Sequence, residues 1–114
     1  MPGNLNNPFL LLSGRELSSV EFVRDYIQLR FDGPRLTIIT DPVVGNSTEE
    51  YARINPNFCN MLCRLIGHPV KDISLNEENI ILYFLDDQII KIFLHSETGE
   101  ALIFDDENGK TWIW

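Results

Sequence analysis

The sequence predicts an α+β fold, with a mostly antiparallel sheet built from two repeated three-strand meanders plus a C-terminal hairpin, and one main covering helix. Three observations predict it: segments 14–31 and 67–84 align position for position, both alternate apolar and polar residues as strands do, and one helix-like stretch separates them. With 114 residues, the chain has the usual size of one domain, so residues 1–114 are predicted to form a single domain.

The internal repeat is marked by coincident glycines, acidic turn residues and alternate apolar positions. The matched pairs are Gly14 and Gly67, Leu17 and Val70, Val20 and Ile73, Phe22 and Leu75, Asp25 and Glu78, Ile27 and Ile80, Leu29 and Leu82, and Phe31 and Phe84. After a one-residue insertion in the second copy, Leu36 and Ile38 match Ile90 and Ile92. Repeat units are therefore predicted over about 14–40 and 67–94.

The two units differ in how apolar their strands are. Ile27, Leu29 and Phe31 alternate with polar residues, which is typical of a strand with one buried face. In the second unit, runs 80–85 and 89–94 are apolar at nearly every position, and such strands are covered on both faces. We therefore expect the second unit to be central or to lie against another subunit.

The main helix is predicted at about residues 56–66, between the two units. Asn55 can cap it, Pro56 suits its first position, and Gly67 ends it. Its apolar face, with Cys59 beside it, is expected to pack on a sheet. Upstream, Ser47 to Glu50 resembles a capping box and predicts a short helical turn over 51–54.

A hairpin is predicted at the C-terminus, because Asn108-Gly109 is the preferred two-residue turn. That turn pairs Asp105 with Trp112 and Ile103 with Trp114. Both indoles would then lie on one face with Ile103, and we expect them to be packed.

Composition bears on partners and location. Nine basic and 17 acidic residues give a net charge of −8, which disfavours nucleic acid and anionic membrane surfaces and would attract a basic protein or a cationic ligand. The more common role of such a charge is only to keep the protein soluble. The apolar run Phe9 to Leu12 is too short for a signal peptide or a membrane span. We expect a cytoplasmic protein.

No residue pattern in the sequence predicts a catalytic site or a metal site. Cys59, Cys63, His68 and His95 are the only soft metal ligands, but their spacing matches no zinc module, so no metal or cofactor is predicted and these residues are expected to serve the core or its boundary. The acidic pairs, such as Asp86-Asp87, read as turn formers. Enzymatic activity is uncertain and less favoured than binding.

Two places are candidates for a binding site. Segment 41–55 reads as the longest irregular stretch, in which Tyr51 and Arg53 could line a pocket. Trp112 and Trp114 could form part of an apolar surface shared with the second unit.

A family resemblance supports the same direction. The pattern L-x-G-x-x-L-x-x-V-x-F, from Leu12 to Phe22, with the later Phe31-Asp32-Gly33, resembles small bacterial proteins of unknown function. Some of these are similar to immunity proteins that neutralise polymorphic toxins. The resemblance implies no catalytic residue and implies a non-enzymatic binder.

The leading hypothesis is therefore a non-catalytic cytoplasmic interaction protein that forms a homodimer, with a charge at Tyr83 or Trp112 expected to weaken the dimer. The alternative is a small enzyme or ligand carrier with a pocket near residues 41–53.

Overall fold

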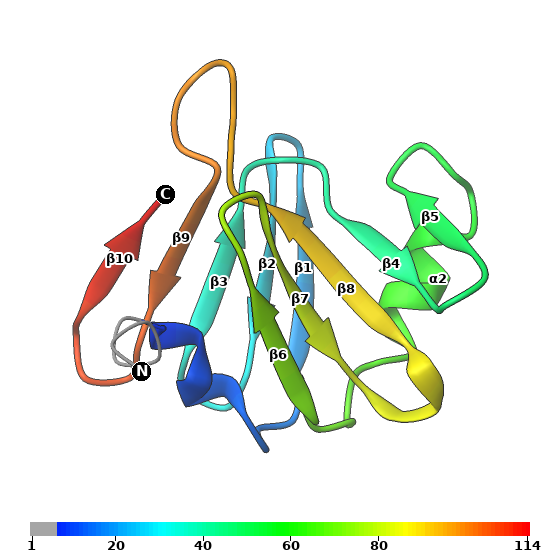
Figure 1. The fold of residues 1–114 in the computed structure, drawn as a ribbon, viewed down its shortest axis with the longest axis horizontal. Helices are drawn as coiled ribbons and strands as arrows, with labels where there is room; N and C mark the ends of the chain where they lie inside the picture. Colours follow the sequence, from blue (N-terminus) through cyan, green and yellow to red (C-terminus); the bar gives the residue numbers. More distant parts are fainter. Residues whose placement is uncertain (1–6) are drawn as a thin grey trace.

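A computed structural model describes residues 7–114, which form two five-stranded antiparallel sheets (Figure 1). The first sheet has the order β1 (Ser19–Val23), β2 (Tyr26–Arg30), β3 (Arg35–Ile38), β9 (Leu102–Asp105) and β10 (Thr111–Ile113). The second sheet has the order β5 (Glu50–Ala52), β4 (Val43–Gly45), β8 (Ile89–Phe93), β7 (Asn79–Tyr83) and β6 (Asp72–Leu75). The α+β class and the mostly antiparallel pairing are confirmed, with the two meanders in separate sheets.

The chain exchanges a hairpin between the sheets. After β3 it crosses to the second sheet, where β4 pairs with β8, and after β8 it crosses back, where β9 pairs with β3. We call residues 8–53 the first half and 58–114 the second half. Each sheet thus combines the meander of one half with the hairpin of the other, which makes the two sheets interdependent.

The strand register is the same in both meanders, as the sequence repeat predicts. The cross-strand pairs correspond one to one: Val20–Leu29 with Ile73–Leu82, Phe22–Ile27 with Leu75–Ile80, and Leu29–Leu36 with Leu82–Ile90. The register extends the correspondence to the exchanged hairpins, where the alignment does not reach. Val44 faces Ile90 as Phe104 faces Leu36, so Tyr51 on β5 corresponds to Trp112 on β10.

Four reciprocal hydrogen bonds join the halves at their centre. Two come from glycines that precede each meander, with φ of +80° at Gly14 and +90° at Gly67, a conformation that glycine adopts without steric cost. The donor and acceptor pairs are Gly14 N–H to Val70 C=O (2.8 Å), Gly67 N–H to Leu17 C=O (2.7 Å), Leu17 N–H to His68 C=O (3.1 Å) and Val70 N–H to Arg15 C=O (2.9 Å). Exchanging matched residues converts each bond into another of the set, so the halves are related by an approximate twofold axis.

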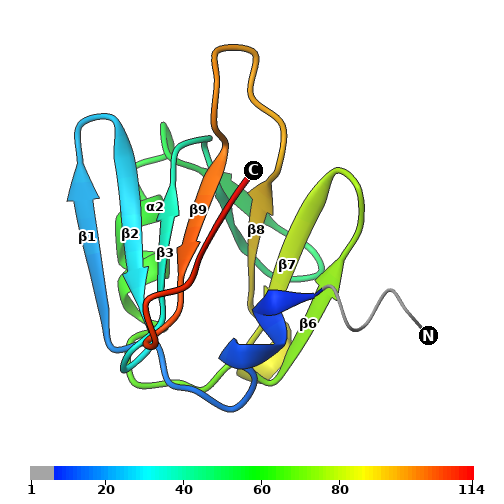
Figure 2. The same ribbon diagram turned by 90° about the vertical axis from the view of Figure 1, so that its left-hand side faces the viewer.

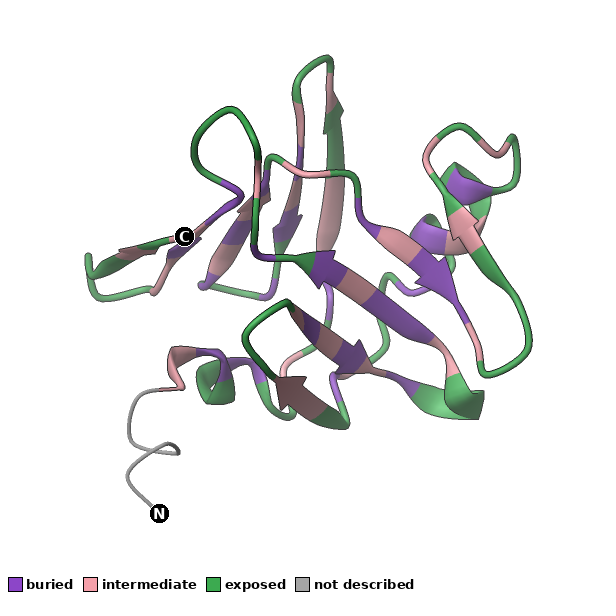
Figure 3. Cartoon of the chain, turned by 45° about the horizontal axis from the view of Figure 1, so that its top comes forward, coloured by how far each residue is buried: buried purple, intermediate pink, exposed green. Residues whose placement is uncertain are grey.

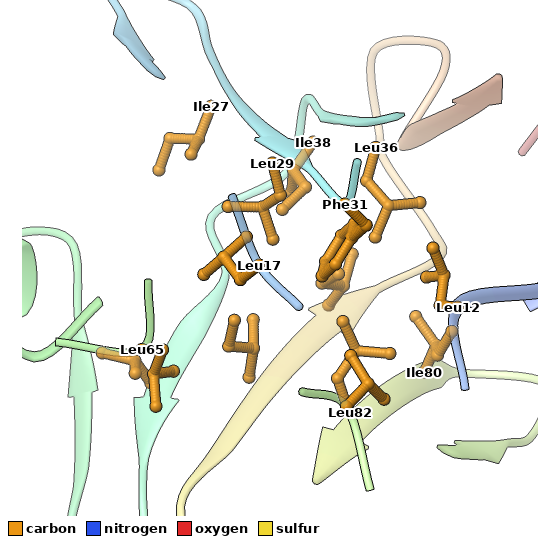
Figure 4. Close-up of a cluster of buried hydrophobic side chains, with 14 of the residues drawn as sticks. Leu12, Leu17, Ile27, Leu29, Phe31, Leu36, Ile38, Leu65, Ile80 and Leu82 are labelled. Carbon is orange, nitrogen blue, oxygen red and sulfur yellow. The ribbon is translucent and has the colours of Figure 1, made fainter. Parts of the chain in front are cut away.

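The core lies between the two sheets, which face each other (Figure 2). On β2, β3 and β7 the inward side chains are buried while their outward neighbours are half-buried or exposed, whereas the inward side chains of the edge strands β1 and β6 remain partly or largely exposed (Figure 3). Figure 4 shows apolar side chains from both halves meeting there, including Leu29, Phe31, Ile80 and Leu82. Burying one such side chain stabilises the fold by about 1.5–3 kcal/mol.

One short helix precedes each meander. The 3-10 helix η1 (Pro8–Leu12) buries Phe9, which stacks on Trp114 with ring centroids 4.7 Å apart. Helix α2 (Phe58–Cys63) contacts β4 and β1 and buries Phe58 and Leu62. It is shorter than the predicted 56–66, because turns replace helical bonding before Gly67.

The C-terminal hairpin has a register different from the predicted one. Trp112 pairs with Phe104 rather than with Asp105, and Ile113 pairs with Ile103. The connection is longer than two residues, because the Asp106 side chain accepts hydrogen bonds from the amides of Asn108 and Lys110 and forms a wider turn. A shift of one residue turns every side chain to the other face, so the indoles share the core face with Phe104.

Segment 41–55 is also more ordered than predicted. It contains the hairpin of β4 and β5 instead of an irregular loop and a helical turn over 51–54. The Asn46 side chain accepts hydrogen bonds from the amides of Thr48 and Glu49 and closes the hairpin turn. This Asx turn competes with the predicted capping box for the same residues.

Candidate functional site

The outward surface of the second sheet is the most apolar of the sheet faces that point away from the core. Side chains of neighbouring strands alternate so that one set faces outward across β4, β7 and β8. We call the apolar members of this set the apolar outer face; they are Val43, Ile81, Tyr83, Ile89 and Phe93, and Lys91 faces outward among them, opposite Val43 and Ile81. Phe93 is 37% exposed, whereas Ile89 is 9% exposed.

The corresponding positions of the first sheet are largely polar. Ile81, Tyr83 and Ile89 correspond to Gln28, Arg30 and Arg35. In the first sheet these side chains bond to neighbours: Gln28 donates to the Thr37 hydroxyl at 3.1 Å, and Arg35 forms an ion pair with Asp105 at 3.1 Å. At these three positions the same backbone carries polar side chains in the first sheet and apolar ones in the second, whereas Val43 corresponds to the apolar Ile103.

A hollow of about 340 Å³ lies on the apolar outer face. One wall comes from β7 and β8 and the other from the β4–β5 hairpin. The lining residues are Asn46, Ser47, Glu50, Ile81, Tyr83, Asp87, Ile89 and Lys91. The hollow exists because the hairpin of the first half is placed beside the meander of the second half.

The rim of the hollow is acidic. Lys91 donates to a Glu50 carboxylate oxygen at 3.0 Å, so its charge is paired, while Asp87 lies exposed at the other side. Asp86 and Asp87 have φ of +59° and +60° in the 3-10 turn η2 (Leu85–Asp87), which joins β7 to β8. The arrangement is an apolar floor with a negative edge, which is suited to binding by burial and charge.

Tyr51 and Arg53, predicted to share a pocket, point to different surroundings. Tyr51 lines a hollow of about 250 Å³ with Asn57, Asn60, Met61 and Arg64. The Glu49 carboxylate accepts the hydrogen bond of the Tyr51 hydroxyl, which raises the pKa of that hydroxyl. The Arg53 guanidinium instead donates to the Val23 carbonyl at 2.9 Å and ties β5 to β1.

Trp112 and Trp114 are half-buried against the core. Trp112 stacks on Phe104 with centroids 5.4 Å apart, and the Lys110 ammonium lies 5.1 Å from its ring centroid. Both indoles belong to the core face of the first sheet, so the predicted surface shared with the second unit is not formed. The reason is the hairpin register described above.

The four soft metal ligands do not occupy the positions predicted for them. Cys59, Cys63, His68 and His95 are all exposed rather than placed in the core or at its boundary. Phe58 and Leu62 share the buried face of α2, whereas Cys59 and Cys63 each lie one residue further along, about 100° around the helix. Across residues 7–114, no three His, Cys, Asp or Glu side chains come together as a metal site.

Part of this site is visible in the sequence. The apolar runs of β7 and β8 identify the floor of the hollow, because both faces of those strands are apolar. The sequence does not indicate that the wall of the hollow consists of Asn46, Ser47 and Glu50, because only the register of the exchanged hairpin brings these residues there.

Comparison with protein-family models, with curated proteins and with solved structures finds no match to this chain. In the described part of the chain, none of the helices has the length and apolar character needed to cross a membrane.

Proposed function

We propose that this protein is a non-catalytic cytoplasmic interaction protein, immunity-like in that it acts by binding, and that the apolar outer face is its binding surface. One observation supports this most directly. At positions where the first sheet carries Gln28, Arg30 and Arg35, the second sheet carries Ile81, Tyr83 and Ile89. The core of the protein requires apolar residues only on the inward face of a sheet. Three apolar residues grouped on the outward face therefore indicate an interface.

A second copy of the chain is the proposed occupant of this face. An apolar surface that is present on each copy can pair with itself about a twofold axis, which is the commonest arrangement in soluble oligomers. Each apolar side chain that becomes fully buried contributes about 1.5–3 kcal/mol before association costs are subtracted. The proposed homodimer would cover the residues that the sequence marks as apolar on both faces of β7 and β8.

The test replaces apolar outer-face residues by their first-sheet counterparts. Light scattering at high micromolar concentration should give twice the 13.2 kDa chain mass for the wild type. The double variant Ile81→Gln, Tyr83→Arg should give the single-chain mass, because both new residues are already tolerated at the equivalent sites. The control Thr37→Arg adds the same charge to the first sheet and should remain dimeric. A wild-type chain that stays at 13.2 kDa contradicts the homodimer.

A basic protein is the alternative occupant, supported by the net charge of −8 and by the acidic rim at Glu50 and Asp87. Salt distinguishes the two cases. Screening weakens the repulsion between two acidic copies, so added salt should strengthen the homodimer. The same screening should weaken a complex with a basic protein.

A small-ligand carrier is the second candidate function, favoured by the hollow itself. Its volume of about 340 Å³ falls in the range of small-molecule sites, and Asn46, Ser47 and Glu50 place one wall within segment 41–53. Native mass spectrometry should then find a small molecule bound to the wild type and lost in Tyr83→Arg, with no change in oligomeric mass.

A further inference from the structure

A partly exposed guanidinium of the first half joins three segments of the chain. Arg15 follows η1, and its side chain donates to the Leu11 carbonyl at 3.2 Å and to the Asp32 carbonyl at 3.1 Å. The same guanidinium forms an ion pair with Glu107 from the β9–β10 turn. The space between the end of η1 and the β2–β3 turn is therefore filled by a side chain of the protein itself.

The equivalent space in the second half is open. It is a hollow of about 210 Å³, lined by Arg64, Leu65, His68, Phe84, Leu85, Asp86 and Gln88. His68 takes the place of Arg15, and its shorter side chain leaves the space unfilled. By the hairpin register, Ser47 takes the place of Glu107, so the carboxylate that closes the first half is also missing.

The acceptors that hold the guanidinium in the first half recur in the second. Asp86 corresponds to Asp32, and both residues have a left-handed backbone, with φ of +59° and +55°. Each turn therefore has a left-handed residue at the matched position. Within residues 7–114, no protein donor bonds to the carbonyls of Arg64 and Asp86, which correspond to those that accept from Arg15.

We propose that this hollow binds the guanidinium group of an arginine side chain supplied by a basic partner. The chain's own first half shows which group fits such a space, and backbone carbonyls are acceptors that suit its planar N–H donors. The net charge of −8 and the lining carboxylate of Asp86 favour a cation. This site is separate from the apolar outer face and does not depend on it.

The positive charge of Arg64, which lines the hollow, disfavours a bound guanidinium, and replacing this residue therefore tests the proposal. Arg64 stands where the first half has Leu11, and its charge repels a bound guanidinium. Arg64 is exposed, so its side chain can extend into solvent while its carbonyl stays in place. Replacing it by the first-half residue, Arg64→Leu, should strengthen binding several-fold.

The experiment is an NMR titration of the full chain with N-acetyl-arginine amide, with N-acetyl-citrulline amide as the uncharged isostere. Saturable shifts are expected at the amides of His68, Asp86 and Gln88 with the arginine probe, and binding at least tenfold weaker with citrulline. No saturable shift there up to tens of millimolar probe, or equal binding of both probes, would overturn the proposal.

Two variants exchange the matched residues Arg15 and His68 between the halves. His68→Arg should fill the hollow from within, as Arg15 does, and should weaken binding of the arginine probe at least tenfold without loss of the folded spectrum. Arg15→His should open the first half and create new shifts at Asp32. If His68→Arg is folded and binds the probe as the wild type does, the hollow is not the site. If His68→Arg does not fold, the test is whether Arg15→His gains binding of the arginine probe at Asp32. An Arg15→His variant without that gain contradicts the proposal.

Discussion

The outward positions of β2 and β3 in the first sheet carry Gln28, Arg30 and Arg35. The matched positions of the second sheet carry Ile81, Tyr83 and Ile89. The inward positions of β2, β3, β7 and β8 show no such divergence, since these strands bury aliphatic residues in the same register. Inward residues are constrained by one shared core, and outward residues are constrained only by what covers them. The proposed interface rests on this difference between the sheets.

The largest expected effect concerns the two equivalent core positions of the exchanged hairpins. Phe104 is fully buried between Phe9 and Trp112, whereas its counterpart Val44 fills less space. Phe104→Ala should lower the free energy of unfolding by about 3–5 kcal/mol, and Val44→Ala by about 2 kcal/mol. Urea unfolding followed by tryptophan fluorescence measures both. Equal losses would mean that the β9–β10 hairpin is no more firmly packed than the β4–β5 hairpin.

The next effect tests why the two hairpins differ in length. Gly45 pairs with Glu50, whereas its counterpart Asp105 pairs with Thr111, so the β4–β5 connection is shorter by one residue. A Cβ atom on Gly45 would lie 2.1 Å from the Glu49 carbonyl oxygen. Gly45→Ala should therefore cost about 1–3 kcal/mol through displaced backbone. Thermal unfolding checks it, and a variant as stable as the wild type would show that the turn can widen freely.

The sequence predicts the repeat, the six meander strands and their inward residues, because alternation and turn residues are local signals. It does not predict which hairpin joins which sheet, since β4 and β9 are paired by contacts across the molecule. The register of Trp112 depends on the Asp106 side chain, which widens the turn that Asn108-Gly109 alone would make tight. One wall of the hollow on the apolar outer face depends on this exchange, so sequence reasoning does not predict that wall, although it does predict the floor on β7 and β8.

A smaller loss of stability, of equal size in the two halves, is expected at the two glycines that flank the approximate twofold axis. Gly14 and Gly67 have positive φ, and a Cβ atom at either would meet no atom within 4 Å. Alanine at either site should therefore cost only backbone strain, about 1–2 kcal/mol. Chemical denaturation of Gly14→Ala and Gly67→Ala should give the same loss within error. A clear inequality would show that one half tolerates distortion at the axis better than the other.

The smallest effect is a pH dependence confined to the first sheet. A hydrogen bond from the Thr111 hydroxyl, with the nearby Arg35 guanidinium, lowers the pKa of Asp105 below its usual value of 3.8, against a smaller opposing effect of burial. A carboxyl group whose pKa is lowered in the folded state stabilises the fold above its unfolded pKa, and this contribution is lost as the pH falls through the folded pKa. The second sheet has Gly45 at this position and no titrating counterpart.

Asp105→Asn keeps an oxygen that can accept from Thr111 and removes the charge. The variant should therefore be less stable than the wild type at neutral pH, and the difference should shrink below about pH 4 and vanish in strong acid. Urea unfolding at a series of pH values measures this difference directly. Asp87→Asn on the second sheet is the control for loss of one negative charge. A difference between Asp105→Asn and the wild type that stays constant from neutral to acid pH would show that the shape of the side chain, and not its ionisation, supports the β9–β10 hairpin.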